Sequence, residues 1–273
     1  RFNSIDVYFN FSFGSLCMQQ IHNNIKKDRN IFLTLSYDGT NYHGFQIQKN
    51  AVTIQEIFQN ALKNVLKCTS EIKGCSRTDS GVHANMYGIS FKTDSKIKCE
   101  NLIFALNRYL PGDIAVNSCK DVDENFHARY SCVAKEYIYK ILNSKIRNPF
   151  LDKYAFHYWY PVDINKLNEA ASMLIGTHDF TSFATIDKSR EASNMVRTIQ
   201  DLSIKKDGDL IIIKIKADGF LYNMVRIIVG TLLRVAQGKI NPEDIPKIIS
   251  EKNRALAGPT APAHGLYLNK IFY

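Results

Sequence analysis

The sequence predicts an α+β protein made of two similar subdomains, with mainly antiparallel sheets flanked by helices. Helical stripes of apolar residues occur in both halves of the chain, strand-like runs lie between them, and hairpin-like turns join many of these runs. With 273 residues, of which 45% are hydrophobic, the chain is long enough for a substantial core. We expect residues 30–148 to form the N-terminal subdomain and residues 149–273 the C-terminal one.

The elements expected in the N-terminal half begin with a strand over residues 31–37, which ends at the Asp38-Gly39 turn. Residues 53–67 carry the clearest helix signal, because apolar side chains recur there at positions i, i+3, i+4 and i+7. Thr53 and Glu56 form a capping-box pattern at the start of this helix. The remaining elements are a strand from residue 71 towards Gly74, a strand over 86–93, a helix over 99–109, and strands over 114–122 and 130–142.

The C-terminal half repeats this order of elements loosely. Asp163 is placed to cap a helix over residues 164–175, which ends at Gly176. Residues 221–237 predict a long helix that Gly238 closes. The remaining elements are a hairpin of strands over 196–205 and 210–217, a helix opened by Asn241-Pro242, and a final strand over 265–273.

Composition limits the classes of function. A formal net charge of +9 favours a polyanionic partner, nucleic acid first, although a soluble protein can also simply be basic. No apolar run reaches the roughly 18 residues of a membrane span, so we expect no membrane partner. The six cysteines include no C-x-x-C pair and no zinc-finger spacing, which favours reduced thiols, a cytoplasmic location and no metal site. Residues 1–29 are expected to be a disordered or artefactual extension.

The stretch GCSRTDSGVHAN, residues 74–85, places Asp79 just before Gly81 in a loop between two expected strands. An Asp-x-Gly sequence by itself is typical of a turn, in which the carboxylate bonds nearby backbone and Gly supplies a positive φ. The alternative is a carboxylate that a rigid scaffold presents as a nucleophile, a base or a metal ligand. In that case Arg77 adds positive potential beside it.

Arg226 favours the second interpretation of this loop. It lies in NMVRIIVG, within a helix that is apolar nearly all round, and a buried guanidinium needs an anionic partner. The alternative is that Arg226 reaches solvent from a partly exposed face. We expect Arg226 to pair with Asp79 across the junction of the two halves, and thereby to lower the pKa of Asp79 and keep it ionised.

Two further groups of residues are weaker candidates. Tyr137 and Tyr139 share one face of an expected strand, where they either pack in the core or, in a basic cleft, stack on a base. His127 and Arg129 either contact phosphate or lie on a turn. The chain has no P-loop, no G-x-G-x-x-G and no G-x-S-x-G motif, so the residues indicate chemistry on a polyanion without a cofactor.

GCSRTDSGVHA resembles the active-site motif G-x-G-R-T-D-A-G-V-H of the TruA family of tRNA pseudouridine synthases. Further blocks follow in the family's order through residues 31–273, among them TIQEIFQNAL, FHARYSCVAKEYIYKI, GFLYNMVRIIVGTLLRVAQG and APAHGLYL. Ser76 stands where the family has Gly, and Ser80 where it has Ala, but the Arg-Thr-Asp and Gly-Val-His runs are intact. Residues 1–29 have no counterpart in the family.

The resemblance implies a pseudouridine synthase fold with a cleft between the subdomains. It implies isomerisation of uridine to pseudouridine at positions 38, 39 and 40 in the anticodon stem-loop of tRNA, by a homodimer that uses no metal and no cofactor. Asp79 would be the catalytic residue, as nucleophile on the sugar or as base. The substrate-binding residues would be Tyr137 against the target base, Arg226 beside Asp79, Leu268 at the base pocket and Arg77 at the displaced nucleotide. Apart from the resemblance, we also expect Arg129 among the substrate-binding residues, as the phosphate contact considered above.

Other classes of function fit the sequence less well. A non-catalytic RNA-binding or chaperone protein accounts for the charge, but not for Asp79 together with Arg226. An enzyme of the same kind that acts on another RNA differs only in its substrate. A metal-dependent nuclease is the least favoured, because no second acid accompanies Asp79 in its loop.

Overall fold

The computed structural model describes residues 29–186 and 194–273. The extension expected over residues 1–29 therefore lies outside the described residues except for Arg29, which begins the first strand. The strands are β1 (Arg29–Tyr37), β2 (Lys73–Gly74), β3 (His83–Thr93), β4 (Ile114–Val122), β5 (Ala134–Leu142), β6 (Phe156–His157), β7 (Gly176–Asp179), β8 (Val196–Asp207), β9 (Leu210–Ala217) and β10 (Leu266–Phe272). The helices are α2 (Ile54–Leu66), α3 (Cys99–Tyr109), α4 (Ile164–Ser172), α5 (Met224–Ala236) and α6 (Ile245–Ser250), with short helical turns η1 (Thr181–Phe183), η2 (Pro242–Asp244), η3 (Arg254–Leu256) and η4 (Ala263–Gly265).

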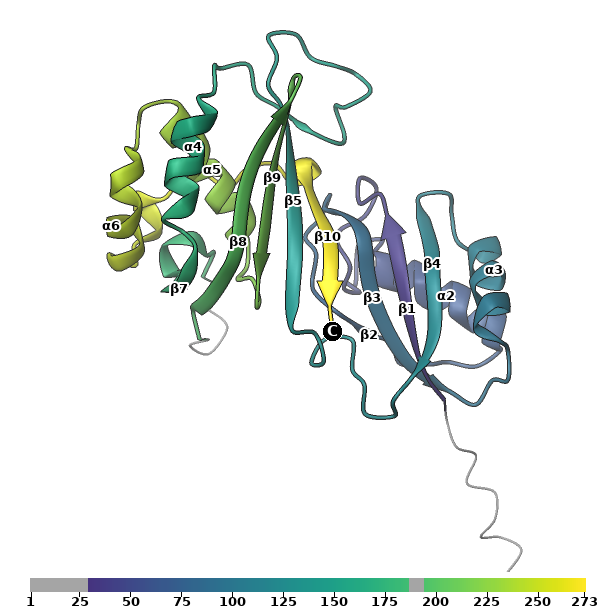
Figure 1. Ribbon diagram of the computed structural model, residues 1–273. Helices are drawn as coiled ribbons and strands as arrows, with labels where there is room; N and C mark the ends of the chain where they lie inside the picture. The colour runs from purple at the N-terminus through teal and green to yellow at the C-terminus, as the bar shows by residue number, and fades with distance from the viewer. Residues whose placement is uncertain (1–28, 187–193) are drawn as a thin grey trace, which may run out of the picture.

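These strands form one sheet, whose order is β4-β1-β3-β10-β5-β9-β8-β7, with β2 beside β3 and β6 beside β5. Neighbouring strands run antiparallel except in the pairs β3–β10 and β5–β6. The helices fall into two groups, with α2 and α3 at one end of the sheet and α4, α5 and α6 at the other (Figure 1). The predicted α+β class with mainly antiparallel strands is confirmed.

The last strand of the chain joins the two halves of the sheet. β10 lies between β3 and β5 (Figure 1), parallel to the first and antiparallel to the second. β5 falls within residues 30–148 of the sequence, yet its other edge pairs with β9 of the C-terminal half. Strand pairing over such sequence separations leaves no local signal, and the subdomain boundary near residue 148 stays a prediction.

The alternation of the central strands places the core on one face of the sheet. In β9, Ile211, Ile213 and Ile215 are buried, and they pair across the sheet with Ile141, Tyr139 and Tyr137 of β5. Paired residues point to the same face because side chains alternate along a strand. Tyr137 is therefore fixed on the face that the buried residues share.

The predicted helix over residues 53–67 is confirmed as α2, but its capping box is wrong. Thr53 makes no side-chain cap bond, and its buried Oγ1 finds no partner within the described ranges. The preceding loop occupies that role, since the amides of Ile54 and Gln55 donate to the carbonyls of Gly44 and Phe45 at 3.2 and 2.9 Å. The first orphan amides of the helix are thus satisfied by backbone rather than by a side chain.

In the C-terminal half, the predicted start of α4 is confirmed, whereas the predicted start of α5 is wrong. The Asp163 cap is confirmed, because its carboxylate accepts from the amides of Asn165 and Lys166 at 2.9 and 3.4 Å. The helix predicted from residue 221 begins later, at Met224, because Asn223 takes a left-handed φ of 61° that ends any helical run. That backbone position aims Asn223 at the site described next.

Candidate active site

The loop that carries Asp79, residues 75–82, connects β2 to β3 and is closed by a tight turn. The amide of Val82 donates to the carbonyl of Asp79 at 3.2 Å, and Gly81 has a φ of 76°. A residue with a side chain rarely adopts that φ, so Gly81 shapes the turn as predicted. The turn is also held from outside, since the Gly81 amide donates to the carbonyl of Tyr42 at 3.2 Å.

The loop rests closely on the segment that precedes α2. Gly44 has a φ of 82°, and a Cβ there would lie 2.3 Å from the carbonyl oxygen of Thr78. Phe45 donates its amide to that same carbonyl at 3.2 Å, and the hydroxyls of Tyr37 and Thr78 lie 2.8 Å apart. The backbone directly before Asp79 is therefore fixed by contacts on both sides.

Asp79 meets Arg226 from the other half of the chain. The Nη1 atom of Arg226, on α5, lies 3.2 Å from Oδ2 of Asp79 and donates to Oδ1 of Asn223 at 3.0 Å. Its Nε donates to the carbonyl of Ala261 at 2.7 Å. The pairing predicted from the sequence is present, and the alternative of an arginine directed only to solvent is wrong.

Arg226 is oriented by a segment that lies directly against α5. A Cβ at Gly230 would lie 1.7 Å from the carbonyl oxygen of Pro259, so only glycine allows this approach. Gly258 donates its amide to Oγ1 of Thr231 at 2.8 Å, and Ala261 donates its amide to the carbonyl of Arg226 at 3.0 Å. The guanidinium is thus held by backbone as well as by Asp79.

The pKa of Asp79 differs from the prediction. We expected Arg226 to lower it, but burial of the carboxyl raises the pKa above its usual range, and the charge and hydrogen bond of Arg226 offset this only in part. The side chains of Asp79 and Arg226 are 27% and 18% exposed. Desolvation of the carboxylate therefore outweighs a single partner that is shared with Asn223 and Ala261.

Tyr137 and Leu268 lie side by side at the centre of the sheet. They are directly paired residues of β5 and β10, and the two residues are 6% and 0% exposed. The Tyr137 ring meets Phe220 edge-on at 5.0 Å, and its hydroxyl lies 3.4 Å from Oγ of Ser76 in the Asp79 loop. Burial raises the pKa of Tyr137 well above its usual range, so the phenol keeps its proton at neutral pH.

Arg77 and Arg129 lie at the surface. Arg77 is exposed two residues before Asp79. Arg129 is exposed in the connection between β4 and β5, where its guanidinium lies 5.7 Å from the ring centre of Tyr130. Neither arginine shares a hydrogen bond or ion pair with Asp79 within the described part of the chain.

Comparison with known proteins agrees with this arrangement. Residues 34–131 and 170–273 match the family described as tRNA pseudouridine synthase. The chain belongs to this family. A tRNA pseudouridine synthase A of Thermoanaerobacter sp. (strain X514) is 51% identical over 245 residues, which cover 90% of this chain and 100% of the relative. Proteins of that name from Acetivibrio thermocellus and Bacillus pumilus are 45% and 46% identical, covering 90% and 88% of this chain and 100% and 97% of their own lengths.

As a tRNA pseudouridine synthase, the chain is an isomerase whose substrate is tRNA. Asp79 and Arg226 both lie within the matched ranges, whereas Tyr137 lies in the unmatched stretch between the two ranges. The described residues include no group of three or more His, Cys, Asp or Glu placed to hold a metal ion. They also include no helix that is long and apolar enough to cross a membrane.

Sequence reasoning missed several residues of this synthase site. In the helix predicted from residue 221, Asn223 and Arg226 would share one face, and in the structure Asn223, the residue before α5, accepts a hydrogen bond from the Arg226 guanidinium. That spacing was a usable signal. Ala261 acts through its carbonyl, and a backbone group carries no signal in the sequence. His83 was assigned no role, although it is 1% exposed and polar.

Proposed function

We propose that this synthase isomerises uridine to pseudouridine at positions 38, 39 and 40 in the anticodon stem-loop of tRNA, with Asp79 as the catalytic residue. The observation that carries the proposal is the carboxylate of Asp79, fixed on a tight turn and paired at 3.2 Å with Arg226 from the other half of the chain. Beside it, Tyr137 and Leu268 are adjacent on one face of the sheet. A rigidly held, partly buried carboxylate beside an aromatic ring suits chemistry on a nucleoside.

The reaction replaces an N–C glycosidic bond with a C–C bond. The N1–C1′ bond breaks, the uracil turns, and C5 bonds to C1′ while its proton is lost and N1 gains one. Asp79 acts either by bonding to C1′ until C5 displaces it, or by removing a sugar proton that is later returned. Both routes need the carboxylate form, and the raised pKa makes that carboxylate more basic.

The other side chains take the roles of holding the substrate. Tyr137 stacks on the target base, Leu268 closes the pocket that retains the detached uracil, and Arg226 orients Asp79. Arg77 holds the displaced nucleotide and Arg129 contacts phosphate; both are exposed and positively charged, as those roles require. The target base must leave its stack, at a cost of a few kcal/mol that phosphate contacts offset. The enzyme acts as a cytoplasmic homodimer without a metal or cofactor.

The test is pseudouridine mapping of tRNA after incubation with the purified protein. Wild type should modify positions 38 to 40, whereas Asp79→Ala and Asp79→Asn should form no pseudouridine and still bind tRNA, because the charge that attracts phosphate is elsewhere. Ser80→Ala is the matched control, since it alters the neighbouring residue of the same turn without removing the carboxylate. Normal turnover by either Asp79 variant would exclude the assigned role.

The same assay separates the neighbouring functions. Modification of unrelated RNA hairpins in preference to the anticodon stem-loop would move the enzyme to another substrate. Binding of tRNA without any pseudouridine would favour a non-catalytic RNA-binding protein. Activity that disappears in a chelator would contradict a mechanism without a metal.

A further inference from the structure

His83 lies where the two halves of the molecule meet. It is the first residue of β3, and it pairs with Tyr267 of β10 in the short parallel contact between the halves. The two rings stack with their centres 4.6 Å apart, and the His83 residue is 1% exposed. A titratable group buried at this junction is expected to have specific partners.

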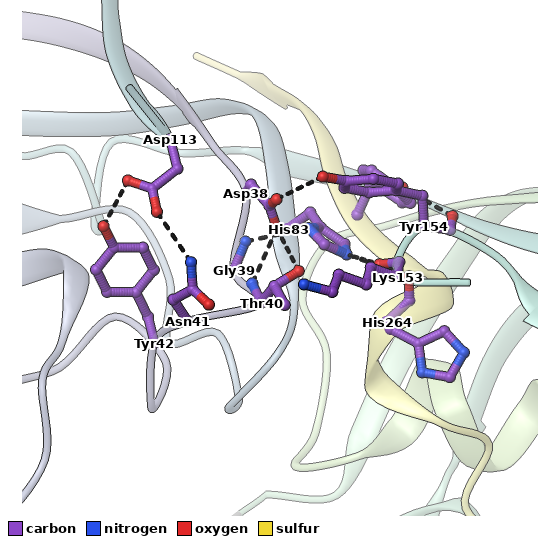
Figure 2. A network of polar contacts seen from close by, with 11 residues as sticks. Asp38, Gly39, Thr40, Asn41, Tyr42, His83, Asp113, Lys153, Tyr154 and His264 are labelled. Atoms are coloured by element: carbon purple, nitrogen blue, oxygen red, sulfur yellow. Dashed lines mark hydrogen bonds and ion pairs between the residues drawn. The ribbon is translucent and has the colours of Figure 1, made fainter. Parts of the chain in front are cut away.

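Each ring nitrogen of His83 has backbone partners (Figure 2). Nδ1 accepts a hydrogen bond from the amide of Gly39 at 3.0 Å. Nε2 lies 3.0 Å from the carbonyl of Lys153 and 3.2 Å from the carbonyl of His264. Because carbonyl oxygens only accept and the Gly39 amide only donates, these three contacts favour the neutral tautomer with its hydrogen on Nε2. The carboxylate of Asp38, 3.1 Å from Nδ1, opposes this preference.

On one side, His83 fixes the end of the loop that carries Asp79. Its neighbour Val82 closes the turn with the carbonyl of Asp79 at 3.2 Å. Gly39 packs on that same Val82, because a Cβ at Gly39 would lie 2.0 Å from the Val82 carbonyl oxygen. The Gly39–His83 bond therefore tightens a contact that already supports the turn.

On the other side, His83 binds the segment that orients Arg226. We refer to residues 261–264 as the arginine-orienting segment, since the carbonyl of Ala261 accepts from Nε of Arg226 at 2.7 Å. The carbonyl of Pro262 accepts from the Tyr139 hydroxyl at 2.8 Å, and that of His264 faces Nε2 of His83 at 3.2 Å. One buried imidazole thus links the Asp79 loop to the segment that aims its ion-pair partner.

We propose that His83 is a positioning residue of the synthase site, whose Nε2–H holds the Asp79 loop in register with the arginine-orienting segment. The inference rests on the proposed function of Asp79. Misplacement of a reacting group by about 1 Å can lower a rate about 100-fold, so a bridge between these two segments acts on the chemical step more than on binding.

The bridge needs an uncharged imidazole. Burial lowers the pKa of His83 below its usual range, although the nearby carboxylate of Asp38 opposes this. The titratable groups around the ring are Asp38, whose Oδ1 lies 3.1 Å from Nδ1, Tyr154 with its ring centre at 5.6 Å, Tyr267 stacked on it, and His264. A proton on Nδ1 would oppose the Gly39 N–H and turn the ring towards Asp38. Solvent can supply that proton through an adjoining hollow of ≈ 300 Å³.

Three substitutions separate the two ends of the ring. His83→Gln keeps an N–H donor for the carbonyls of Lys153 and His264, but loses the acceptor for Gly39. His83→Asn keeps an acceptor near the position of Nδ1 and is too short to reach the carbonyls. His83→Leu removes both. His157→Gln is the matched control, because the Nε2 of His157 also lies 2.9 Å from a backbone carbonyl, that of Ser144.

We expect kcat to fall in the variants that lack a hydrogen-bond donor at the position of Nε2. His83→Leu and His83→Asn should lower kcat about 100-fold, with the tRNA dissociation constant nearly unchanged, whereas His83→Gln should stay within about 10-fold of wild type. His157→Gln should retain the wild-type kcat. Circular dichroism and the unfolding temperature identify a variant that fails to fold. Equal kcat for the folded Gln and Asn variants, or a wild-type kcat for either Asn or Leu, would overturn the proposal.

The pH profile supplies a readout that a merely structural histidine would not change. In wild type, the acid limb of kcat should be steeper than that of one proton, because burial raises the pKa of Asp79 and lowers the pKa of His83, which brings the two titrations closer together. In His83→Gln, the slope of this acid limb should fall to the value expected for one titrating group. An unchanged slope contradicts the proposal.

Failure of this inference is distinguishable from failure of the proposed function. If wild type makes no pseudouridine, the function proposed for Asp79 is wrong, and kcat tests nothing about His83. The ¹⁵N chemical shifts of a histidine-labelled protein, assigned with His83→Gln, still report the tautomer. A neutral Nε2–H imidazole agrees with the bridge, and a ring charged at neutral pH overturns it without any activity measurement.

Discussion

At the scale of single residues, two opposing effects act on the pKa of Asp79. Burial of its carboxyl group raises the pKa, and an ion pair with an arginine that also has other partners lowers it. Arg226 divides its donors among Asp79, Asn223 and Ala261, so Asp79 receives only part of its charge and hydrogen bonding. Burial dominates, and the pKa of Asp79 is raised. A more basic carboxylate is a better proton acceptor. As the pH falls, however, it becomes protonated at a higher pH than the carboxylate of an ordinary aspartate.

The raised pKa predicts how stability changes with pH. The folded protein holds the Asp79 proton more tightly than the unfolded chain does, so stability is greatest below the ordinary pKa of aspartate and falls as pH rises through the folded pKa. Asp79→Asn has no such proton and keeps an oxygen that can accept from Arg226. The unfolding temperature of this variant should therefore rise relative to wild type between about pH 4 and pH 7.

Asp121→Asn gives the opposite sign as a control. Its hydrogen bond with Arg29 lowers the pKa of Asp121, so wild type gains stability as pH rises from this lowered pKa to the ordinary pKa of aspartate. The variant should lose ground to wild type over that more acidic range, and the gap should stay constant above it. Because Asp121 is exposed, the change should be smaller and should shrink in salt. If the unfolding temperature of Asp79→Asn does not rise relative to that of wild type as the pH increases, burial does not dominate the pKa of Asp79.

For whole elements, the site depends on how closely the chain after Gly258 approaches α5. Gly230→Ala should destabilise the protein by about 1–3 kcal/mol, because the added methyl overlaps the carbonyl of Pro259 and neither backbone can yield easily. It should also lower kcat, since the displaced segment carries the Ala261 carbonyl that holds Arg226. Urea unfolding measures the first effect and pseudouridine formation the second.

Gly112→Ala is the matched control for this prediction. A Cβ at Gly112 meets nothing within 4 Å, so its free energy of unfolding should stay within about 0.5 kcal/mol of wild type. Equal stability of the Gly230→Ala and Gly112→Ala variants would mean that α5 and the segment can separate without cost.

The sequence predicts elements better than their pairing or their caps. The apolar stripe of α2 is a local pattern and predicts the helix, whereas Thr53 matches a capping pattern but the Gly44 and Phe45 carbonyls accept from the first amides instead. The final strand was expected, but its place between β3 and β5 was not, because residues more than a hundred positions apart decide it. Local patterns carry no information about such partners.

Across the whole molecule, the candidate site was predictable where a residue is chemically out of place. An arginine in an apolar helix required an anion, and the structure brings Asp79 to it. The direction of the Asp79 pKa was not predictable, because it depends on burial by segments distant in sequence. His83 was missed for the same reason, since its partners are backbone groups of three separate segments.

The overall charge predicts how binding depends on salt. With a net charge of +9, the protein should bind tRNA through phosphate contacts, and affinity should fall steeply between about 50 and 200 mM salt as counterions are released. If Arg77 and Arg129 each contact a phosphate, Arg77→Ala and Arg129→Ala should each reduce the slope of log affinity against log salt by about 1.

Lys166→Ala, which alters an exposed cation on α4, is the control and should leave the slope unchanged. Fluorescence anisotropy of labelled tRNA, measured with Asp79→Ala present in every variant, excludes turnover from the titration. Equal slopes for all variants would place the phosphate contacts elsewhere on the surface.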